Sequence, residues 1–298
     1  HHPRKETGRS LILQSHLDVV PPGPEAMWQH KPYGGEIVGD WMFGRGAGDM
    51  KAGAAANVFA LDALRFAVSA WTLANAGVIW FQVEVRGVPV HVREMGQGAN
   101  AIDAAYRVIG RLRQLEAEWN TRKAQHPHFE NEAHPINLNI GKIEGGDWAS
   151  SVPCWCRVDC RVGLYPGITA KETAQRIEDC IREAARSDSF LANNPPKVTF
   201  NGFWAEGYVL EPGSEAEAVL ARAHEAALGK PLKSFMTAAY LDTRVHALYD
   251  KIPALCYGPM GENIHAFDER VSLASVKRIT GAMALFVAEW CGLESIEG

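Results

Sequence analysis

The sequence lacks several features that would place it in a particular class of protein. No run of apolar residues approaches the roughly 20 that a membrane-spanning helix needs. No block of Lys or Arg stands out and the net charge is -5, so we expect neither a nucleic-acid nor a membrane partner. Cysteine is scarce, six residues among 298, which is too few for a disulfide-built scaffold. The remaining composition, 47% hydrophobic and 22% charged, is that of a globular protein with one large or two ordinary domains.

Three of the cysteines lie close together in the segment CWCRVDC, a grouping that could indicate a metal site. Their spacing argues against that interpretation. Cys154, Cys156 and Cys160 alternate in phase with Val158 and Val162, and the residues between them include two arginines and an aspartate. The alternation predicts a half-buried strand with reduced cysteines on its inner face. Reduced cysteines fit a cytoplasmic protein.

The order of the predicted elements indicates that one domain is interrupted by another. In the middle of the chain, strands are expected at 78–86, 136–143, 152–163 and 197–204, and helices at 99–119 and 171–186. This β-α-β-β-α-β order is that of a ferredoxin-like unit, so we place an inserted α+β domain at 73–205. The apolar residues expected to face its core from the first helix are Ile102, Ala105, Tyr106, Ile109, Leu112 and Leu115.

The flanking residues 1–72 and 206–298 are expected to form an α/β domain in which helices flank a mixed sheet. Its elements are expected as strands at 10–15 and 252–257, a hairpin at 36–43 that turns at Gly39-Asp40, and helices at 49–66, 215–228 and 273–290.

Three segments of this flanking domain place histidine, aspartate and glycine where predicted strands end. His16 is either a satisfied histidine in a polar loop or a metal ligand whose second ring nitrogen is held by Asp18, through its carboxylate or its backbone. Asp49 follows a glycine-rich turn and is either a metal-bridging carboxylate or a helix N-cap. His265 lies on another glycine-rich loop and is either a ligand or a surface residue. Together the two histidines and the aspartate form a donor set that suits zinc.

The segments HLDVVP, GRGAGDMKAG and GPMGENIHAFDERV resemble the zinc-dependent amidohydrolase and exopeptidase family of acetylornithine deacetylase, succinyl-diaminopimelate desuccinylase, aminoacylase and carboxypeptidase G. RGVPVH at 86–91 and GANAI at 98–102 resemble the lid motif of that family, and the inserted domain is similar to its lid and dimerisation domain. The resemblance covers nearly the whole chain. It implies a metallopeptidase or deacylase in which metal-activated water cleaves the amide bond of an N-acylamino acid or small peptide.

The resemblance also implies the metal site and the assembly. His16 and His265 would each bind one of two zinc ions, with cobalt and manganese as alternatives, Asp49 would bridge the ions, and Asp18 would support the site. The chain would form a homodimer through the lid domain. His91 resembles the lid histidine that reaches the active site of the partner subunit and steadies the developing oxyanion.

The positions that the resemblance places near the substrate are Asn100, Arg161, Thr237 and Arg244. Arg244 is a candidate for binding the carboxylate of the substrate. The alternative for this arginine is a structural ion pair with Asp242.

The sequence departs from the family in one segment. Between the helix that follows Asp49 and the lid, the family carries a Glu-Glu pair and a later acidic ligand, and the first Glu is the general base. Here only about eleven residues, 67–77, lie between the predicted helix and strand, and none is acidic. Each zinc ion would then have two protein ligands, whereas catalytic zinc usually takes three.

Three explanations of this departure stay open. The natural chain contains residues that this sequence lacks, or the protein is a deleted form without activity, or another residue, from this chain or a partner, substitutes. We favour the first, because a deletion of this size would remove central strands and expose unpaired backbone groups. The alternative function is that of an inactive relative acting as a binding or dimerisation protein, and bound metal distinguishes the two.

Overall fold

The computed structural model describes residues 9–63 and 71–292, which divide into two compact units. Unit 1 takes in the chain up to residue 72, residues 211–235 and the chain from 255 onward. Unit 2 takes in 73–210 and 236–254, so the second of these segments packs with the inserted domain and not with the domain to which its sequence position pointed. In the part of the chain that is described, every helix is too short or too polar to span a lipid bilayer.

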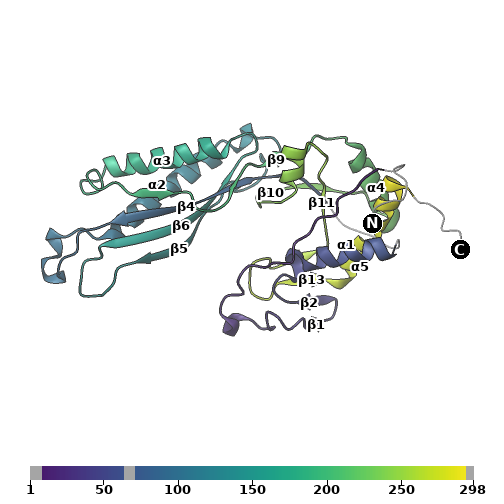
Figure 1. Ribbon diagram of the computed structural model, residues 1–298, viewed down its shortest axis with the longest axis horizontal. Helices are drawn as coiled ribbons and strands as arrows, with labels where there is room; N and C mark the ends of the chain where they lie inside the picture. The colour runs from purple at the N-terminus through teal and green to yellow at the C-terminus, as the bar shows by residue number, and fades with distance from the viewer. Residues whose placement is uncertain (1–8, 64–70, 293–298) are drawn as a thin grey trace. The chain divides into compact units, whose positions relative to one another are not determined.

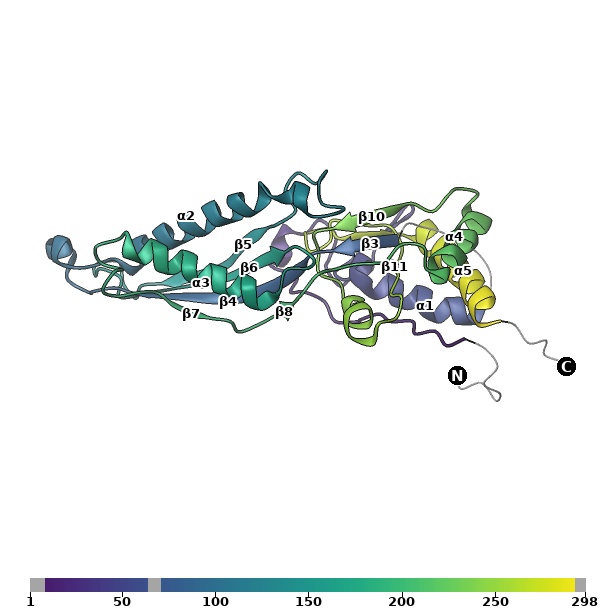
Figure 2. The same ribbon diagram turned by 90° about the horizontal axis from the view of Figure 1, so that it is seen from above.

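Unit 2 consists of two helices on one face of an antiparallel sheet (Figures 1 and 2). Its main elements are β4 (Gly77–Arg86), α2 (Ala101–Asn120), β5 (Leu138–Gly145), β6 (Trp155–Leu164), α3 (Ala170–Arg186) and β7 (Lys197–Thr199). The strands lie in the order β5-β6-β4-β7 and pair antiparallel, which is the ferredoxin-like arrangement that the sequence predicts. The short strand β8 (Trp204–Ala205) pairs with the beginning of β4.

The helix α2 covers the sheet with a stripe of small and aliphatic side chains. The fully buried apolar members of this stripe are Ala101, Ala104, Ala105, Val108, Leu112 and Leu115. Tyr106, expected to face the core, is instead 61% exposed, so that prediction is wrong. At 100° per residue, position 106 lies roughly 150° from the centre of the buried stripe.

The cysteine strand is confirmed. Cys156, Val158, Cys160 and Val162 of β6 are buried beneath the helices, and all six cysteines of the chain are thiols. Burial raises the pKa of the Cys160 thiol to about 12. This thiol therefore behaves as a small apolar core residue.

Among the described residues, unit 1 has three α-helices: α1 (Ala52–Ala63), α4 (Glu215–Leu228) and α5 (Leu273–Cys291). The helix α5 packs against both of the others (Figure 1). Small side chains such as Ala60 and Ala282, both fully buried, allow the helices to approach closely. The predicted bounds of α4 are confirmed, because Ser214 and Glu217 form a capping box at its start and Gly229 (φ 65°) ends it.

The strands of unit 1 are short. The predicted hairpin is confirmed as β1 (Ile37–Val38) and β2 (Trp41–Phe43), and the sheet order is β1-β2-β13-β12, with β12 at Gly261–Glu262 and β13 at Arg270–Ser272. A separate sheet is made of β3 (Trp71–Asn75), β10 (Ser234–Thr237), β11 (Cys256–Tyr257) and β9 (Tyr208–Val209), the last of which belongs to unit 2. Each ladder of defined register in unit 1 is antiparallel.

The strand predicted at 10–15 is wrong, since these residues are extended without strand pairing. A strand needs a neighbour to pair its N–H and C=O groups, and within the described residues none lies beside this segment. The segment runs along α1, where the Asn57 side chain donates to the Gln14 carbonyl at 3.1 Å. The predicted end of the helix at 64–66 and residues 67–70 of the acid-free segment lie outside the described residues.

Candidate metal centre

The carboxylate of Asp49 lies between two histidines of unit 1. His16 Nε2 is 3.3 Å from one carboxylate oxygen, and His265 Nε2 is 3.3 Å from the other. The three side chains are partly exposed, so the cluster opens to solvent. The structure thus brings together the three residues that the sequence proposes as metal ligands.

The ring of His16 is held from behind by Asp18. His16 Nδ1 lies 3.1 Å from the Asp18 backbone oxygen and 3.5 Å from its carboxylate, which is almost fully exposed. Of the two contacts that the sequence leaves open, the backbone one is therefore the hydrogen bond. A proton on Nδ1 leaves Nε2, the atom that faces Asp49, with its lone pair available to a metal.

The turn before Asp49 needs glycine. Gly46 has a φ of 79°, and a Cβ at this position would lie 2.2 Å from Val19 Cγ1. Asp49 itself has non-helical backbone angles, and the Asp49-Met50 peptide bond is cis. The regular helix starts at Ala52, so the carboxylate of Asp49 projects from the turn that leads into α1.

The loop that carries His265 has an unusual backbone. Asn263, His265 and Asp268 all have φ between 54° and 65°, a left-handed conformation that Asn and Asp tolerate but that costs about 1 kcal/mol or more for His265. Asp268 fastens the loop, because its carboxylate accepts hydrogen bonds from the backbone N–H groups of Gln29 at 2.9 Å and His30 at 3.0 Å. The surrounding structure therefore holds His265 in this position.

A buried ion pair that the sequence does not reveal lies beneath the cluster. Arg45 Nη1 donates to Glu269 Oε2 at 2.6 Å, and both side chains are almost completely buried. The other oxygen, Oε1, accepts hydrogen bonds from the backbone N–H groups of Gly48 at 3.1 Å and Asp49 at 3.0 Å. The only signal in the sequence was the position of Glu269 four residues after His265, and Arg45 lies far away along the chain.

The donor set fits two metal ions that share Asp49, with one imidazole nitrogen for each. Nitrogen and carboxylate oxygen donors are those that zinc takes. Among the residues that the structure describes, no three His, Cys, Asp or Glu side chains are grouped so as to hold a single ion by themselves. Among these residues, each half of such a centre would have two protein donors, one fewer than catalytic zinc usually takes.

The remaining predicted site residues belong to unit 2. His91 is exposed, and its Nδ1 accepts the Arg93 N–H at 3.1 Å. The Asn100 side chain caps α2 by accepting the N–H groups of Ile102 and Asp103. Thr237, at the end of β10, accepts the Ala239 N–H at 3.1 Å.

The two predicted substrate-binding arginines also belong to unit 2. Burial lowers the pKa of Arg161, which lies on β6 and faces away from the helices. Arg244 is buried, donates to the Glu206 carbonyl at 2.9 Å and to the Tyr249 hydroxyl at 3.0 Å, and lies 3.6 Å from the Glu206 carboxylate. Within the described residues its ionic neighbour is therefore Glu206, so the alternative of an ion pair with Asp242 is wrong.

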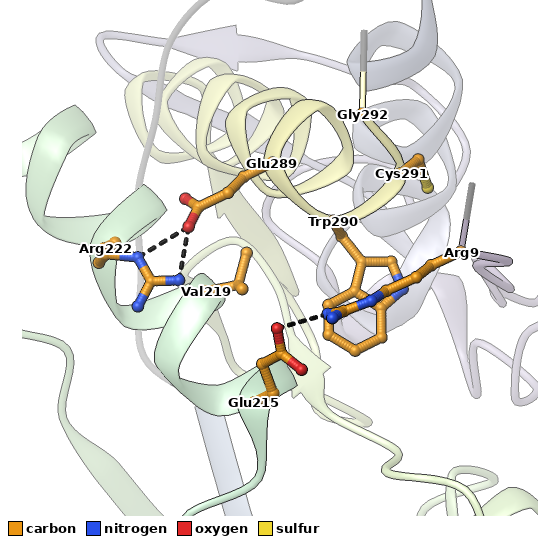
Figure 3. A pocket seen from close by; sticks show the side chains of 8 residues that line it. All are labelled: Arg9, Glu215, Val219, Arg222, Glu289, Trp290, Cys291 and Gly292. Atoms are coloured by element: carbon orange, nitrogen blue, oxygen red, sulfur yellow. Dashed lines mark hydrogen bonds and ion pairs between the residues drawn. The ribbon is translucent and has the colours of Figure 1, made fainter. Parts of the chain in front are cut away.

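A surface pocket separate from the Asp49 cluster lies between α4 and the end of α5 (Figure 3). Its charged groups already form ion pairs, Arg9 with Glu215 at 2.6 Å and Arg222 with Glu289 at 2.5 Å. Arg9 also lies over the ring of Trp290. None of the predicted site residues lines this pocket.

Comparison with known proteins relates the chain to amide-bond hydrolases. Residues 73–189 match the model of the M20 peptidase dimerisation domain. These residues form a peptidase dimerisation domain of the M20 family. The expected relationship to amidohydrolases and exopeptidases is confirmed, because homologues of the chain are amide-bond hydrolases.

Two curated homologues match nearly the whole length of this chain. One is an N-formyl-4-amino-5-aminomethyl-2-methylpyrimidine deformylase from Bacillus subtilis, 26% identical over 95% of this chain and 79% of the relative. The other is a succinyl-diaminopimelate desuccinylase from Cereibacter sphaeroides, 26% identical over 92% and 81%. The alignment with the deformylase extends over 343 residues, which is longer than this 298-residue chain. The deformylase therefore has residues within the aligned region that this chain lacks.

Solved structures of two peptidases share the fold. A metallo-carboxypeptidase from Sulfolobus solfataricus matches with a TM-score of 0.71 at 13% identity, over 92% of this chain and 83% of that one. A di-peptidase from Saccharomyces cerevisiae matches with a TM-score of 0.73 at 14% identity, over 97% and 81%.

Proposed function

We propose that the protein is a zinc-dependent hydrolase that cleaves the amide bond of an N-acylamino acid or small peptide. One observation carries the proposal: the two carboxylate oxygens of Asp49 each face a different histidine, His16 or His265, at 3.3 Å. Bridging carboxylates hold metal pairs about 3.5–4 Å apart in many hydrolases. The homologous deformylase and desuccinylase support amide cleavage as the reaction.

In this proposal His16 and His265 each hold one ion and Asp49 holds both. Zinc, when bound, supplies a water that is acidic enough to attack a carbonyl near neutral pH. The Asp18 carbonyl keeps the lone pair of His16 Nε2 directed at the site. Because the cluster is partly exposed, an acyl amide can approach it from solvent.

Residues of unit 2 would complete the site. His91 would stabilise the oxyanion in a partner subunit, and the chain would form a homodimer through residues 73–189. Arg244 would bind the substrate carboxylate, with Asn100, Arg161 and Thr237 near the substrate. The Asn100 oxygen already caps α2, so only its amide N–H₂ group would reach a substrate.

A specific observation favours the second candidate function, an inactive relative that binds or dimerises. No acidic residue lies at 67–77, where the family has its general base. Glu262 and Glu269, the glutamates nearest to His265 in sequence, are both engaged, Glu262 with Arg270 at 2.6 Å and Glu269 with Arg45. Neither is placed to act as the base.

The two candidate functions are separated by metal content and turnover in one experiment. The purified chain is dialysed against zinc, its metal is measured by mass spectrometry, and formyl-, acetyl- and succinyl-amino acids are offered as substrates. A hydrolase binds zinc and releases free amine, and the release stops when Asp49 is replaced by Asn. Little or no bound zinc, together with no release of amine from any of the three acyl classes, supports the inactive relative.

A further inference from the structure

We infer that Glu269 is a positioning residue that sets the Asp49 carboxylate between the two histidines. The inference rests on the metal centre proposed above. It assigns to the buried Arg45–Glu269 pair a task beyond stabilising the fold.

The side chain of Glu269 fixes the peptide that leads into Asp49. Its Oε1 atom accepts both the Gly48 N–H and the Asp49 N–H, at 3.1 and 3.0 Å. Two hydrogen bonds to adjacent N–H groups fix the orientation of that peptide, and the backbone position of Asp49 sets where its short side chain can reach. Asp49 is therefore held before any metal arrives.

The backbone of Glu269 holds the same turn from its other end. The Gly44 N–H donates to the Glu269 carbonyl at 2.8 Å, so Glu269 is hydrogen-bonded to both ends of the turn at 44–49. Glu269 also directly follows the loop of His265. A shift of Glu269 would thus move Asp49 and His265 relative to each other.

Arg45 orients the Glu269 carboxylate toward the two backbone N–H groups. Its guanidinium donates to Oε2 at 2.6 Å, which leaves Oε1 to the backbone N–H groups. If Glu269 became Gln, Arg45 would take the single carbonyl oxygen and the amide N–H₂ group would face the two backbone donors. The hydrogen-bond acceptor for Asp49 would be lost, although the side chain keeps its size.

The test compares three variants of the full chain. Glu269→Gln removes the acceptor, whereas Arg45→Met/Glu269→Gln removes the competing guanidinium, so that the amide oxygen can turn back to the Gly48 and Asp49 N–H groups. Arg45→Met/Glu269→Met removes the ion pair and the acceptor together. Replacing both partners of a buried ion pair avoids an unpaired buried charge. Zinc affinity is measured by competition with a chromophoric chelator, the visible spectrum of the cobalt form reports the ligand geometry, and circular dichroism reports folding.

We expect Glu269→Gln and Arg45→Met/Glu269→Met to bind zinc about 10–100-fold more weakly and to alter the cobalt spectrum. Arg45→Met/Glu269→Gln should bind within about threefold of the unchanged chain, because the acceptor returns. The control Glu262→Gln should keep full affinity, since Glu262 pairs with Arg270 at 2.6 Å and does not bond to the turn before Asp49.

Equal zinc affinity in all folded variants would overturn the inference while leaving the metal centre intact. If Arg45→Met/Glu269→Met does not fold, the comparison of Glu269→Gln with Arg45→Met/Glu269→Gln is decisive. The inference is overturned if the second of these binds zinc no more tightly than the first. Absence of zinc binding by the unchanged chain would instead refute the proposed function itself.

Discussion

His265 Nε2 lies 3.3 Å from an oxygen of Asp49, although the two residues belong to opposite ends of the chain. The pairing of β2 with β13 explains this. Phe43, the last residue of β2, is the register partner of Arg270, the first residue of β13. The turn that carries Asp49 and the loop that carries His265 therefore leave the sheet at the same end.

The two histidines should contribute separately to metal binding. In His16→Ala and His265→Ala each, we expect about one zinc equivalent to be lost and one to remain, because Asp49 and the other histidine still hold the second ion. Metal analysis after dialysis measures this. Full retention in both variants would contradict the assignment, and His30→Ala is a matched control, since His30 pairs with Glu36 away from the cluster.

The clustering of His16, Asp49 and His265 could be predicted from the sequence because each lies in a short glycine-rich or His-Asp segment with its own signature. Glu269 could not be assigned, because its role depends on a partner, Arg45, from the other end of the chain. The prediction of a strand at 10–15 was wrong for a related reason. An apolar run predicts burial, but a strand also needs a neighbour, and sequence periodicity does not show which neighbour exists. Tyr106 was wrongly placed in the core because it directly follows the buried Ala105. One residue along a helix turns the side chain by about 100°, which takes Tyr106 out of the buried stripe.

Arg244→Lys should destabilise unit 2 by about 1–3 kcal/mol, because the Lys ammonium cannot reproduce the planar fork that reaches both the Glu206 carbonyl and the Tyr249 hydroxyl. Urea unfolding measures the loss. Tyr249→Phe is the milder control, since Tyr249 is 62% exposed and water can replace its hydroxyl.

If Arg244 binds the substrate carboxylate, Arg244→Lys also raises KM for N-acylamino acids more than for their carboxamides, and an equal KM effect on both would argue against that role.

Asp40 makes the stability of unit 1 depend on pH in the acidic range. The Ser272 hydroxyl and the Ala274 N–H, which donate to Asp40 at the start of α5, lower the pKa of this carboxyl from its ordinary value. The folded state thus favours the ionised form, so the stabilisation is present above the ordinary pKa of about 3.9 and is lost as pH falls through the lowered one. Asp40→Asn should lower Tm at pH 7, and the difference from the unchanged chain should shrink below about pH 4. A Tm difference independent of pH would contradict this.

The buried thiols should resist alkylation. With the pKa of Cys160 raised to about 12, about one molecule in ten thousand is thiolate there at pH 8. Iodoacetamide at pH 8 should modify the half-exposed Cys154 well before Cys160, as read by peptide mass spectrometry. In guanidinium the two should react alike, and rapid modification of Cys160 in the folded chain would contradict its placement in the core.

Zinc content per chain, measured on the unchanged protein and on Asp49→Asn after equal dialysis, tests the central claim most directly. Since Asp49 is proposed to bind both ions, we expect about two zinc ions per unchanged chain and close to none in the variant, with both proteins folded by circular dichroism. Zinc that is absent from the unchanged protein, or equal in the two, would contradict the account.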